Sequence, residues 1–430
     1  MSSGSPYYSL AGQPPDAHSP RKEICNYFSP SPIYSLAWSR RDDRAQGFRM
    51  ALGSFSEASS NTLQVIQLSP YHDAQHTPEL ADFGTVCEAP VDYPLTKVQW
   101  QPGGGPGPDL VAGSGDALRL WEVEATGEVG ELGVGRGRLR VRAQMSTRAD
   151  YSAPITAFDW CQADPRLIIA SSIDTTCTLW DVETQQARTQ LIAHDREVFD
   201  VGFVAGSPHV FASAGADGSV RMFDLRALEH STILYEAPPD TAPATADVHA
   251  VDAARVASFV PPLLRLSCNA LDPNYLATFA LDSQTVSVID VRHPGAAVVQ
   301  LVGHLGPVHA VQWSPVSSTQ LCSAGADARV LVWDIQQTLA ARQIHLRQAG
   351  MQAAQARQLG RIAAEGSEAG SGVQAAAQAA AAQAVVQNPS SVAPSLTYAA
   401  RLAVNSLAWH QTSPEWISIG FGNTVQTLRL

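Results

Sequence analysis

Two segments of the chain carry serine, histidine and aspartate, the residue types of a hydrolytic triad. In the first segment, His304, Ser323 and Asp327 are followed by Trp333. A histidine that is oriented by a carboxylate can take the proton of a serine hydroxyl, so this set contains the groups needed for nucleophilic catalysis. The same groups can also form a chain of hydrogen bonds that holds a fold together.

The arrangement recurs along the chain, and this favours the structural interpretation. A second segment has the same residue types at the same intervals: His194, Ser213, Asp217 and Phe223. A third keeps two of the four positions, Asp174 and Trp180. A nucleophile is normally unique, whereas a structural contact recurs with each repeat. We therefore predict hydrogen-bond chains in which aspartate accepts from histidine, serine bridges and the indole N–H donates, each charge-assisted bond being worth about 1.5–3 kcal/mol. Phe223 cannot donate, so its chain is one bond short.

Short apolar segments of one repeating pattern would position these residues. The clearest copies are residues 63–68, 118–123, 177–182, 220–225, 286–291, 330–335 and 425–430. Each unit begins with a segment of alternating apolar residues that in most cases ends in an aromatic ring: 33–38, 96–100, 155–160, 198–203, 263–268, 308–313 and 404–409. Trp180 and Phe223 are 43 residues apart, and Ile289 and Trp333 are 44 apart. These intervals match a WD40 blade, so the sequence predicts an all-β, seven-bladed WD40 β-propeller.

The remaining segments define the domain organisation. Residues 1–20 are rich in Ser, Pro and Gly, which predicts a disordered leader before a single propeller over 21–430. The seventh unit has no segment assigned to its outer strand, so we expect residues 22–28 to pair with it and close the ring. Insertions occur at about 237–261 and 336–394. The Ala/Gln-rich second insertion has high helix propensity but no apolar stripe, and we interpret it as a flexible excursion, with a docking arm as the alternative.

Charge and composition exclude several classes of function. The net charge of −12 argues against sequence-independent binding to nucleic acid or to an anionic membrane. No apolar run approaches the 18 residues of a membrane span. The six cysteines are scattered and form no CxxC pair, which is typical of buried, reduced thiols in the cytosol or nucleus. Neither a metal-ligand spacing nor a cofactor-binding loop is evident, so no metal and no cofactor are expected.

One basic segment stands out in this acidic chain. Residues 124–149 contain five arginines, namely Arg136, Arg138, Arg140, Arg142 and Arg148. We interpret the segment as a solvated outer strand with a loop. The alternative is a patch for RNA or an acidic partner, which would show a steep salt dependence of affinity.

Several longer segments resemble one family of WD40 proteins. They are ALGSF (51–55), APITAFDW (153–160), SSIDTTCTLWDVET (171–184), TQLIAHDREVFDV (189–201), ADGSVRMFDLRALEHSTILYE (216–236), DPNYLAT (272–278) and WDIQQ (333–337). Over about residues 21–430 the chain resembles the TRANSPARENT TESTA GLABRA / anthocyanin-regulator family and its animal kinase-binding, cullin-4-associated relatives. Cys268, where the family usually has an aromatic residue, and the insertions depart from the family pattern.

The resemblance implies a non-enzymatic scaffold found in nucleus and cytoplasm, and we expect the propeller to be a monomer. Its expected partners are MYB and basic helix-loop-helix transcription factors or DYRK- and HIPK-type protein kinases. FDLR (223–226) and IDVR (289–292) also resemble the WDxR box that docks on the DDB adaptor of cullin-4 ubiquitin ligases. Arg226 and Arg292 would then contact that adaptor, and the alternative function is a substrate receptor of the ligase. Against this, each arginine can simply pair with a local carboxylate.

Overall fold

The structure is a computed structural model of the 430-residue chain. It describes residues 23–41, 48–57, 60–71, 81–103, 107–145, 153–239, 260–344, 347–348, 351 and 390–430. The expected leader at 1–20 therefore lies outside the described residues, as do most of the two insertions.

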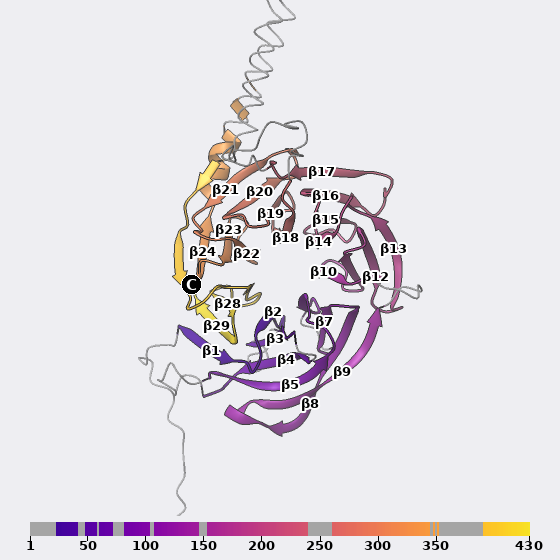
Figure 1. The fold of residues 1–430 in the computed structure, drawn as a ribbon, viewed down its shortest axis with the longest axis vertical. Helices are drawn as coiled ribbons and strands as arrows, with labels where there is room; N and C mark the ends of the chain where they lie inside the picture. The colour runs from indigo at the N-terminus through magenta and orange to yellow at the C-terminus, as the bar shows by residue number, and fades with distance from the viewer. Residues whose placement is uncertain are drawn as a thin grey trace, which may run out of the picture.

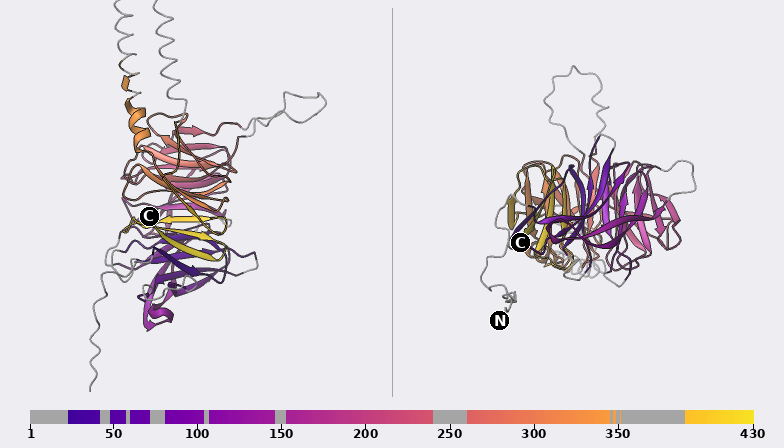
Figure 2. Two further views of the ribbon diagram at one scale, coloured as in Figure 1. Left: turned by 90° about the vertical axis from the view of Figure 1, so that its left-hand side faces the viewer. Right: turned by 90° about the horizontal axis from the view of Figure 1, so that it is seen from below.

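Seven β-sheets in the described part of the chain stand around a ring, one for each predicted unit (Figure 1). Viewed from the side they form a disc (Figure 2). Blade 1 contains β2 (Ile33–Trp38), β3 (Arg49–Ser54), β4 (Asn61–Leu68) and β5 (Phe83–Val91). Blade 2 contains β6 (Lys97–Trp100), β7 (Leu110–Ser114), β8 (Leu118–Val129) and β9 (Gly135–Met145). Blade 3 contains β10 (Ile155–Trp160), β11 (Leu167–Ser172), β12 (Thr176–Asp181) and β13 (Gln186–Ile192).

The later blades follow the same order from the inner to the outer strand. Blade 4 contains β14 (Val198–Phe203), β15 (Val210–Gly215), β16 (Ser219–Asp224) and β17 (Ser231–Glu236). Blade 5 contains β18 (Leu263–Cys268), β19 (Tyr275–Ala280), β20 (Thr285–Asp290) and β21 (Ala297–Val302). Blade 6 contains β22 (Val308–Trp313), β23 (Gln320–Gly325), β24 (Arg329–Asp334) and β26 (Leu396–Ala399). Blade 7 contains β27 (Ser406–Trp409), β28 (Trp416–Phe421), β29 (Thr424–Arg429) and β1 (Ile24–Phe28). The predicted seven-bladed propeller is confirmed.

The predicted ring closure is also confirmed. Strand β1 pairs antiparallel with β29, from Ile24 opposite Leu428 to Phe28 opposite Thr424. In Figure 1 the first strand lies beside the last strands of the chain. The Gln426 side-chain amide donates to the Asn26 side-chain oxygen at 2.8 Å. The backbone groups along this side of β29 are therefore paired, and β1 serves as the outer strand of blade 7.

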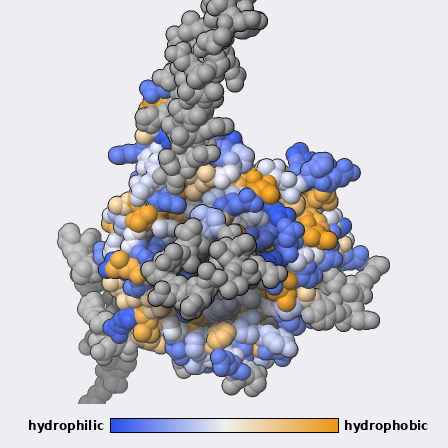
Figure 3. Space-filling model, turned by 45° about the horizontal axis from the view of Figure 1, so that its top comes forward, coloured by the Kyte–Doolittle hydropathy of each residue, from blue (hydrophilic) through white to orange (hydrophobic). Residues whose placement is uncertain are grey.

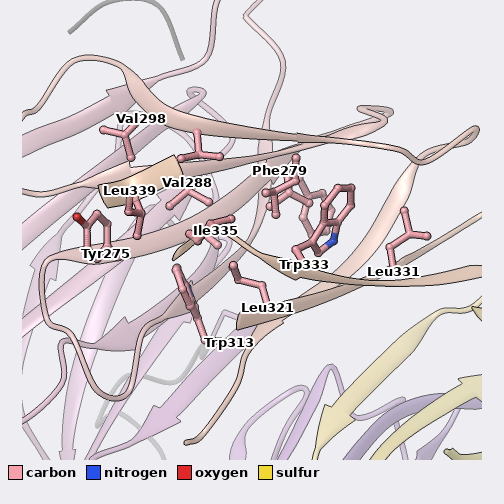
Figure 4. Packing of buried hydrophobic residues seen from close by; sticks show 14 of the residues in the cluster. Tyr275, Phe279, Val288, Val298, Trp313, Leu321, Leu331, Trp333, Ile335 and Leu339 are labelled. Atoms are coloured by element: carbon pink, nitrogen blue, oxygen red, sulfur yellow. The ribbon is translucent and has the colours of Figure 1, made fainter. Parts of the chain in front are cut away.

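The hydrophobic core lies between neighbouring blades. In the cluster shared by blades 5 and 6, Phe279 and Val288 of one sheet pack with Trp313, Leu321 and Trp333 of the next (Figure 4). Alternation along each strand sends one set of side chains to each neighbouring blade, which explains why the third strands read as nearly continuous apolar runs. Burial of one such large side chain stabilises the fold by about 1.5–3 kcal/mol.

The ends of the second insertion are more ordered than the sequence suggested. A helix over residues 336–344 follows β24, and its Leu339 belongs to the cluster shared by blades 5 and 6. Near the other end of the insertion, β25 (Ser390–Val392) pairs in parallel with β21 and gives blade 5 a fifth strand. The helix was missed as a packed element because the residue that it places in the core, Leu339, lies outside the Ala/Gln-rich stretch.

Candidate interaction sites

The predicted hydrogen-bond chain is present in blade 6. His304 precedes the inner strand, and its Nδ1 lies 3.1 Å from both carboxylate oxygens of Asp327 in the turn between β23 and β24. Its Nε2 lies 2.8 Å from the Ser323 hydroxyl on β23. The indole N–H of Trp333 on β24 donates to the same hydroxyl at 2.9 Å. A neutral His304 with its proton on Nδ1 satisfies every group, because the serine hydroxyl then donates to Nε2.

Burial and charge agree with a neutral histidine. Burial lowers the pKa of His304, and this outweighs the opposite effect of Asp327. Burial alone would raise the pKa of Asp327, but bonds from the Leu305 backbone N–H and from His304 hold it below its usual value. Ser323 is fully buried and its hydroxyl is shared between imidazole and indole. A substrate has no access to this hydroxyl in the folded state, so the arrangement holds the blade together.

Blade 4 contains the shorter chain. His194 Nδ1 lies 2.9 Å from Asp217, and Nε2 lies 2.7 Å from Ser213. Phe223 occupies the tryptophan position and stacks on Phe211 with ring centroids 5.1 Å apart. The pKa of Asp217 is strongly lowered, since bonds from His194 and Ser219 outweigh the effect of burial.

Two further contacts in blade 4 were missed by the sequence analysis. The hydroxyl of Ser219 donates to Asp217 at 2.8 Å. Arg221 contacts Asp217 at 3.0 Å and the exposed Asp195 at 2.6 Å. The signal was available in the spacing Asp217, Ser219, Arg221, because alternate residues of a strand and its turn lie on one side.

In blade 3 the expected chain does not form among the described residues. Asp174 caps its own turn, accepting from the hydroxyl of Thr176 at 2.6 Å. The indole N–H of Trp180 is buried without a hydrogen-bond acceptor. The reason is a missing hydroxyl: Ile168 lies opposite Trp180, and the residue two places on is Ala170, where blades 4 and 6 have serine. Asp174 and Trp180 match the pattern, but without a serine at position 170 they are not joined, and the prediction for these two residues was wrong.

Carboxylates on the inner strands link several blades around the central channel. Asp200 on β14 accepts from Lys97 of blade 2 at 3.1 Å and from the Leu266 backbone of blade 5 at 3.0 Å. Asp159 on β10 accepts from the Phe203 backbone at 2.8 Å. Burial raises the pKa of Asp159, against the lowering effect of Lys97. The sequence analysis missed these contacts, because only the closed ring brings the strands together.

Arg226 and Arg292 lie in the turns between third and outer strands, on the face opposite to the histidine–aspartate pairs. Arg226 makes two bonds to Asp224, at 2.9 and 2.6 Å. Arg292 makes two bonds of 2.8 Å to Asp290 and a third to the Tyr275 hydroxyl at 3.0 Å. Each side chain is thus paired with a local carboxylate while remaining substantially exposed, at 66% and 44%. The two arginines occupy equivalent turns of neighbouring blades and share one face.

The basic segment forms one side of a long hairpin in blade 2. Arg138 and Arg140 contact Glu124 at 2.5 and 3.5 Å, and Arg142 contacts Glu122 at 3.2 Å. Both glutamates lie on β8 and the arginines on β9. Cross-strand pairing therefore neutralises part of the charge that made this segment a candidate patch. Arg148 lies outside the described residues.

The face that carries His194 and His304, called here the His–Asp face, presents large apolar side chains. They lie in turns between second and third strands or in loops that enter inner strands: Phe28, Phe55, Tyr93, Ile173, Leu281, Leu305 and Leu402. Their exposed fractions run from 42% for Phe55 to 68% for Leu305. On the coloured part of the surface in Figure 3, hydrophobic patches are scattered among hydrophilic residues. Apolar and aromatic groups of this kind are the usual anchors of protein interfaces.

Neither a metal site nor a membrane-spanning helix is found among the described residues. No group of three or more His, Cys, Asp or Glu side chains in these ranges is placed to hold a metal ion. No helix among the described residues is both long and apolar enough to span a membrane.

Comparison with known proteins identifies similar chains. The family described as "WD domain, G-beta repeat" matches residues 185–224 and 295–334. The DDB1- and CUL4-associated factor 7 homolog of Dictyostelium discoideum is 38% identical over 95% of this chain and 99% of its own length. The uncharacterized WD repeat-containing protein C17D11.08 of Schizosaccharomyces pombe is 40% identical over 77% of this chain and 74% of its own length. The WD repeat-containing protein YPL247C of Saccharomyces cerevisiae is 39% identical over 73% and 58%.

Proposed function

Because the chain belongs to the WD-repeat family of the DDB1- and CUL4-associated factor 7 homolog, we propose that it is a non-enzymatic scaffold that binds regulatory proteins through its His–Asp face. The observation that carries this proposal is the set of exposed apolar side chains in the turns of that face. The hydrogen-bond chain of blade 6 holds one of these loops in place, because Asp327 accepts both from His304 and from the backbone N–H of Leu305. A rigid platform of this kind raises the effective concentration of two bound partners without performing chemistry.

The proposed partners are protein kinases of the DYRK and HIPK type, or transcription factors of the MYB and basic helix-loop-helix type. The support for them is the family resemblance of the sequence segments described above. In this proposal the kinases or transcription factors carry the activity, and the propeller holds them close to one another.

The test compares two faces of one blade. Leu305 is 68% exposed on the His–Asp face, and Val316 is 56% exposed in the turn between β22 and β23 on the opposite face. Capture of a DYRK-type kinase on purified protein should be lost in Leu305→Glu, because a charge cannot be desolvated in an apolar contact. It should persist in Val316→Glu, the matched control. Equal capture by both variants, or loss only in Val316→Glu, would place the kinase elsewhere and refute the assignment of the face.

The second candidate function is that of a substrate receptor of a cullin-4 ubiquitin ligase. It is supported by the name of the Dictyostelium relative and by the common face of Arg226 and Arg292. A combined Arg226→Ala and Arg292→Ala variant should lose capture of the DDB adaptor and keep kinase binding. Arg166→Ala is the control, since Arg166 makes a similar ion pair with Asp164 on the same face. Absence of adaptor binding to the unmodified protein removes this function.

We further propose that the scaffold works in the nucleus and the cytoplasm. Its six cysteines are free thiols, which suits a reducing compartment. Burial raises the pKa of Cys87 to about 12, so this thiol stays protonated and unreactive. Fluorescence imaging of a tagged chain tests the location, and exclusive recovery in a secreted fraction would contradict it.

A further inference from the structure

The His–Asp face carries an excess of negative charge among its apolar side chains. Six carboxylates in the turns and entry loops of this face are exposed: Glu57, Asp92, Asp174, Asp195, Glu197 and Asp282. The exposed cations in the same described turns and loops are Arg196 and Arg401. The sequence between the described parts adds to the excess, because residues 146–152 and 240–259 together contain four aspartates and two arginines. A partner that covers this face must therefore supply positive charge as well as apolar groups.

One part of the His–Asp face combines aromatic rings with carboxylates. The turn after β3 carries Phe55 and Glu57, and the loop that enters β6 carries Asp92 and Tyr93. Phe55 is 42% exposed and Tyr93 is 59% exposed. Tyr34 at the start of β2 lies beside the first turn, with its ring centroid 5.5 Å from that of Phe55. We call these five residues the aromatic–acidic patch.

Strand β2 holds the two loops of the aromatic–acidic patch beside each other. The hydroxyl of Ser35 on β2 donates to the Leu95 carbonyl in the loop that enters β6, at 2.8 Å. The backbone N–H of Phe55 donates to the Pro32 carbonyl at 2.9 Å, just before β2 begins. The rings and carboxylates are thus presented from loops that are fixed to one strand. Little ordering of these loops is required when a partner binds, which favours affinity.

Arginine is the side chain that fits both components of the aromatic–acidic patch. A guanidinium group is planar and stacks on the faces of aromatic rings. Its fork of N–H donors matches the geometry of a carboxylate, so one arginine can contact a ring and a neighbouring acid together. The phosphates of a nucleic acid would instead be repelled by the carboxylates of this face. The chemistry of the patch therefore favours a basic protein segment as its ligand.

We propose that partner proteins dock on the His–Asp face through a basic segment in which arginine is interspersed with apolar residues, and that one arginine of this segment binds at the aromatic–acidic patch. This docking mode rests on the proposed function, since it takes the His–Asp face as the interaction surface. The apolar residues of the segment cover exposed side chains of the adjoining blade 7, such as Phe28 and Leu402. Its cations meet the carboxylates that lie between the apolar groups of the face.

Fluorescence polarisation on the full chain tests the proposal. The probe is a fluorescein-labelled peptide of repeated Gly-Arg-Leu units, and two control peptides replace either the arginine by glutamine or the leucine by serine. We expect the Gly-Arg-Leu peptide to bind and its affinity to fall as the salt concentration rises, because its charges pair with surface carboxylates. Each control peptide should bind about tenfold more weakly or not at all, since it lacks one of the two kinds of contact.

Matched variants separate binding at the aromatic–acidic patch from general attraction to an acidic protein. Glu57→Lys combined with Asp92→Lys should weaken binding of the Gly-Arg-Leu peptide about tenfold, because two attractive contacts become repulsive. Glu229→Lys combined with Glu415→Lys changes the net charge equally, at exposed positions on the opposite face, and should leave the affinity unchanged. Tyr93→Leu keeps an apolar side chain but removes the ring, and it should weaken binding severalfold.

The possible results separate this docking mode from the proposed function. Absence of binding by the Gly-Arg-Leu peptide, equal binding of a control peptide, equal weakening in the two double variants or unchanged affinity in Tyr93→Leu would overturn the docking mode. Kinase capture that depends on Leu305 would then still support the His–Asp face as the scaffold surface. Conversely, if kinase capture is independent of Leu305 while the peptide binds as expected, the proposed function fails and the patch remains a site for basic segments. Circular dichroism verifies that each variant is folded.

Discussion

Removal of one hydroxyl in blade 6 should cost more stability than the same change in blade 4. Ser323→Ala leaves two buried groups without their partner, Nε2 of His304 at 2.8 Å and Nε1 of Trp333 at 2.9 Å. Ser213→Ala leaves only Nε2 of His194, at 2.7 Å, because Phe223 has no polar atom there. The two serines are both fully buried, so solvent cannot replace either hydroxyl.

The magnitudes follow from the number of orphaned groups. Each buried polar group left without a partner costs about 1–3 kcal/mol. We therefore expect a loss of about 4 kcal/mol for Ser323→Ala and about 2 kcal/mol for Ser213→Ala. The difference of about 2 kcal/mol is the contribution of the hydrogen bond from the Trp333 indole to the free energy of unfolding.

Equilibrium unfolding in urea, followed by tryptophan fluorescence and circular dichroism, measures both variants. A cycle with Trp333→Phe gives an independent value: in the Ser323→Ala background this second change should cost less than in the unmodified chain, because the bond is already gone. Equal losses in the two serine variants would refute the bond-counting argument. Hydrolytic turnover that depends on Ser323 would refute the structural role itself.

Three further expectations concern the ring, the incomplete blade and acid. Deletion of residues 21–28 should lower the free energy of unfolding by roughly 3–6 kcal/mol, since Cys25 and Tyr27 are buried in the last blade; an unchanged melting curve would contradict the closure. Ala170→Ser should stabilise by about 1 kcal/mol in urea titration by giving the Trp180 indole an acceptor, and a loss of stability would show that the site has no room. Acidification through pH 6.5 should lower the melting temperature, because the unfolded chain binds a proton that buried His304 resists. Below about pH 4 the melting temperature should fall further, because the pKa of Asp327 is lowered in the folded state and the unfolded chain then binds a proton more readily. In His304→Gln the fall in melting temperature near pH 6.5 should be smaller. If the melting temperature of this variant depends on pH as in the unmodified protein, another group causes the fall.

The sequence predicted features that depend on local pattern and on repetition. The blade count, the strand positions and the pairing of β1 with β29 followed from alternation and spacing. The chains through His194 and His304 followed from recurrence at fixed intervals. Contacts made by the closed ring did not follow, because Asp200 meets Lys97 and Leu266 only when several blades surround one channel. The packing of Leu339 did not follow either, since the helix over residues 336–344 contacts blade 5 only in the folded ring.

The pairing of β1 with β29 also constrains how the protein folds during its synthesis. The side chains of Asn26 and Gln426 are in contact although the two residues are 400 positions apart in the sequence. During translation β1 is made before blades 1–6, while its partner β29 is made after them. A nascent chain with six finished blades therefore still lacks the partner of β1, and contacts of such long range form slowly. Chaperone demand should therefore be highest between the completion of blade 6 and the synthesis of β29.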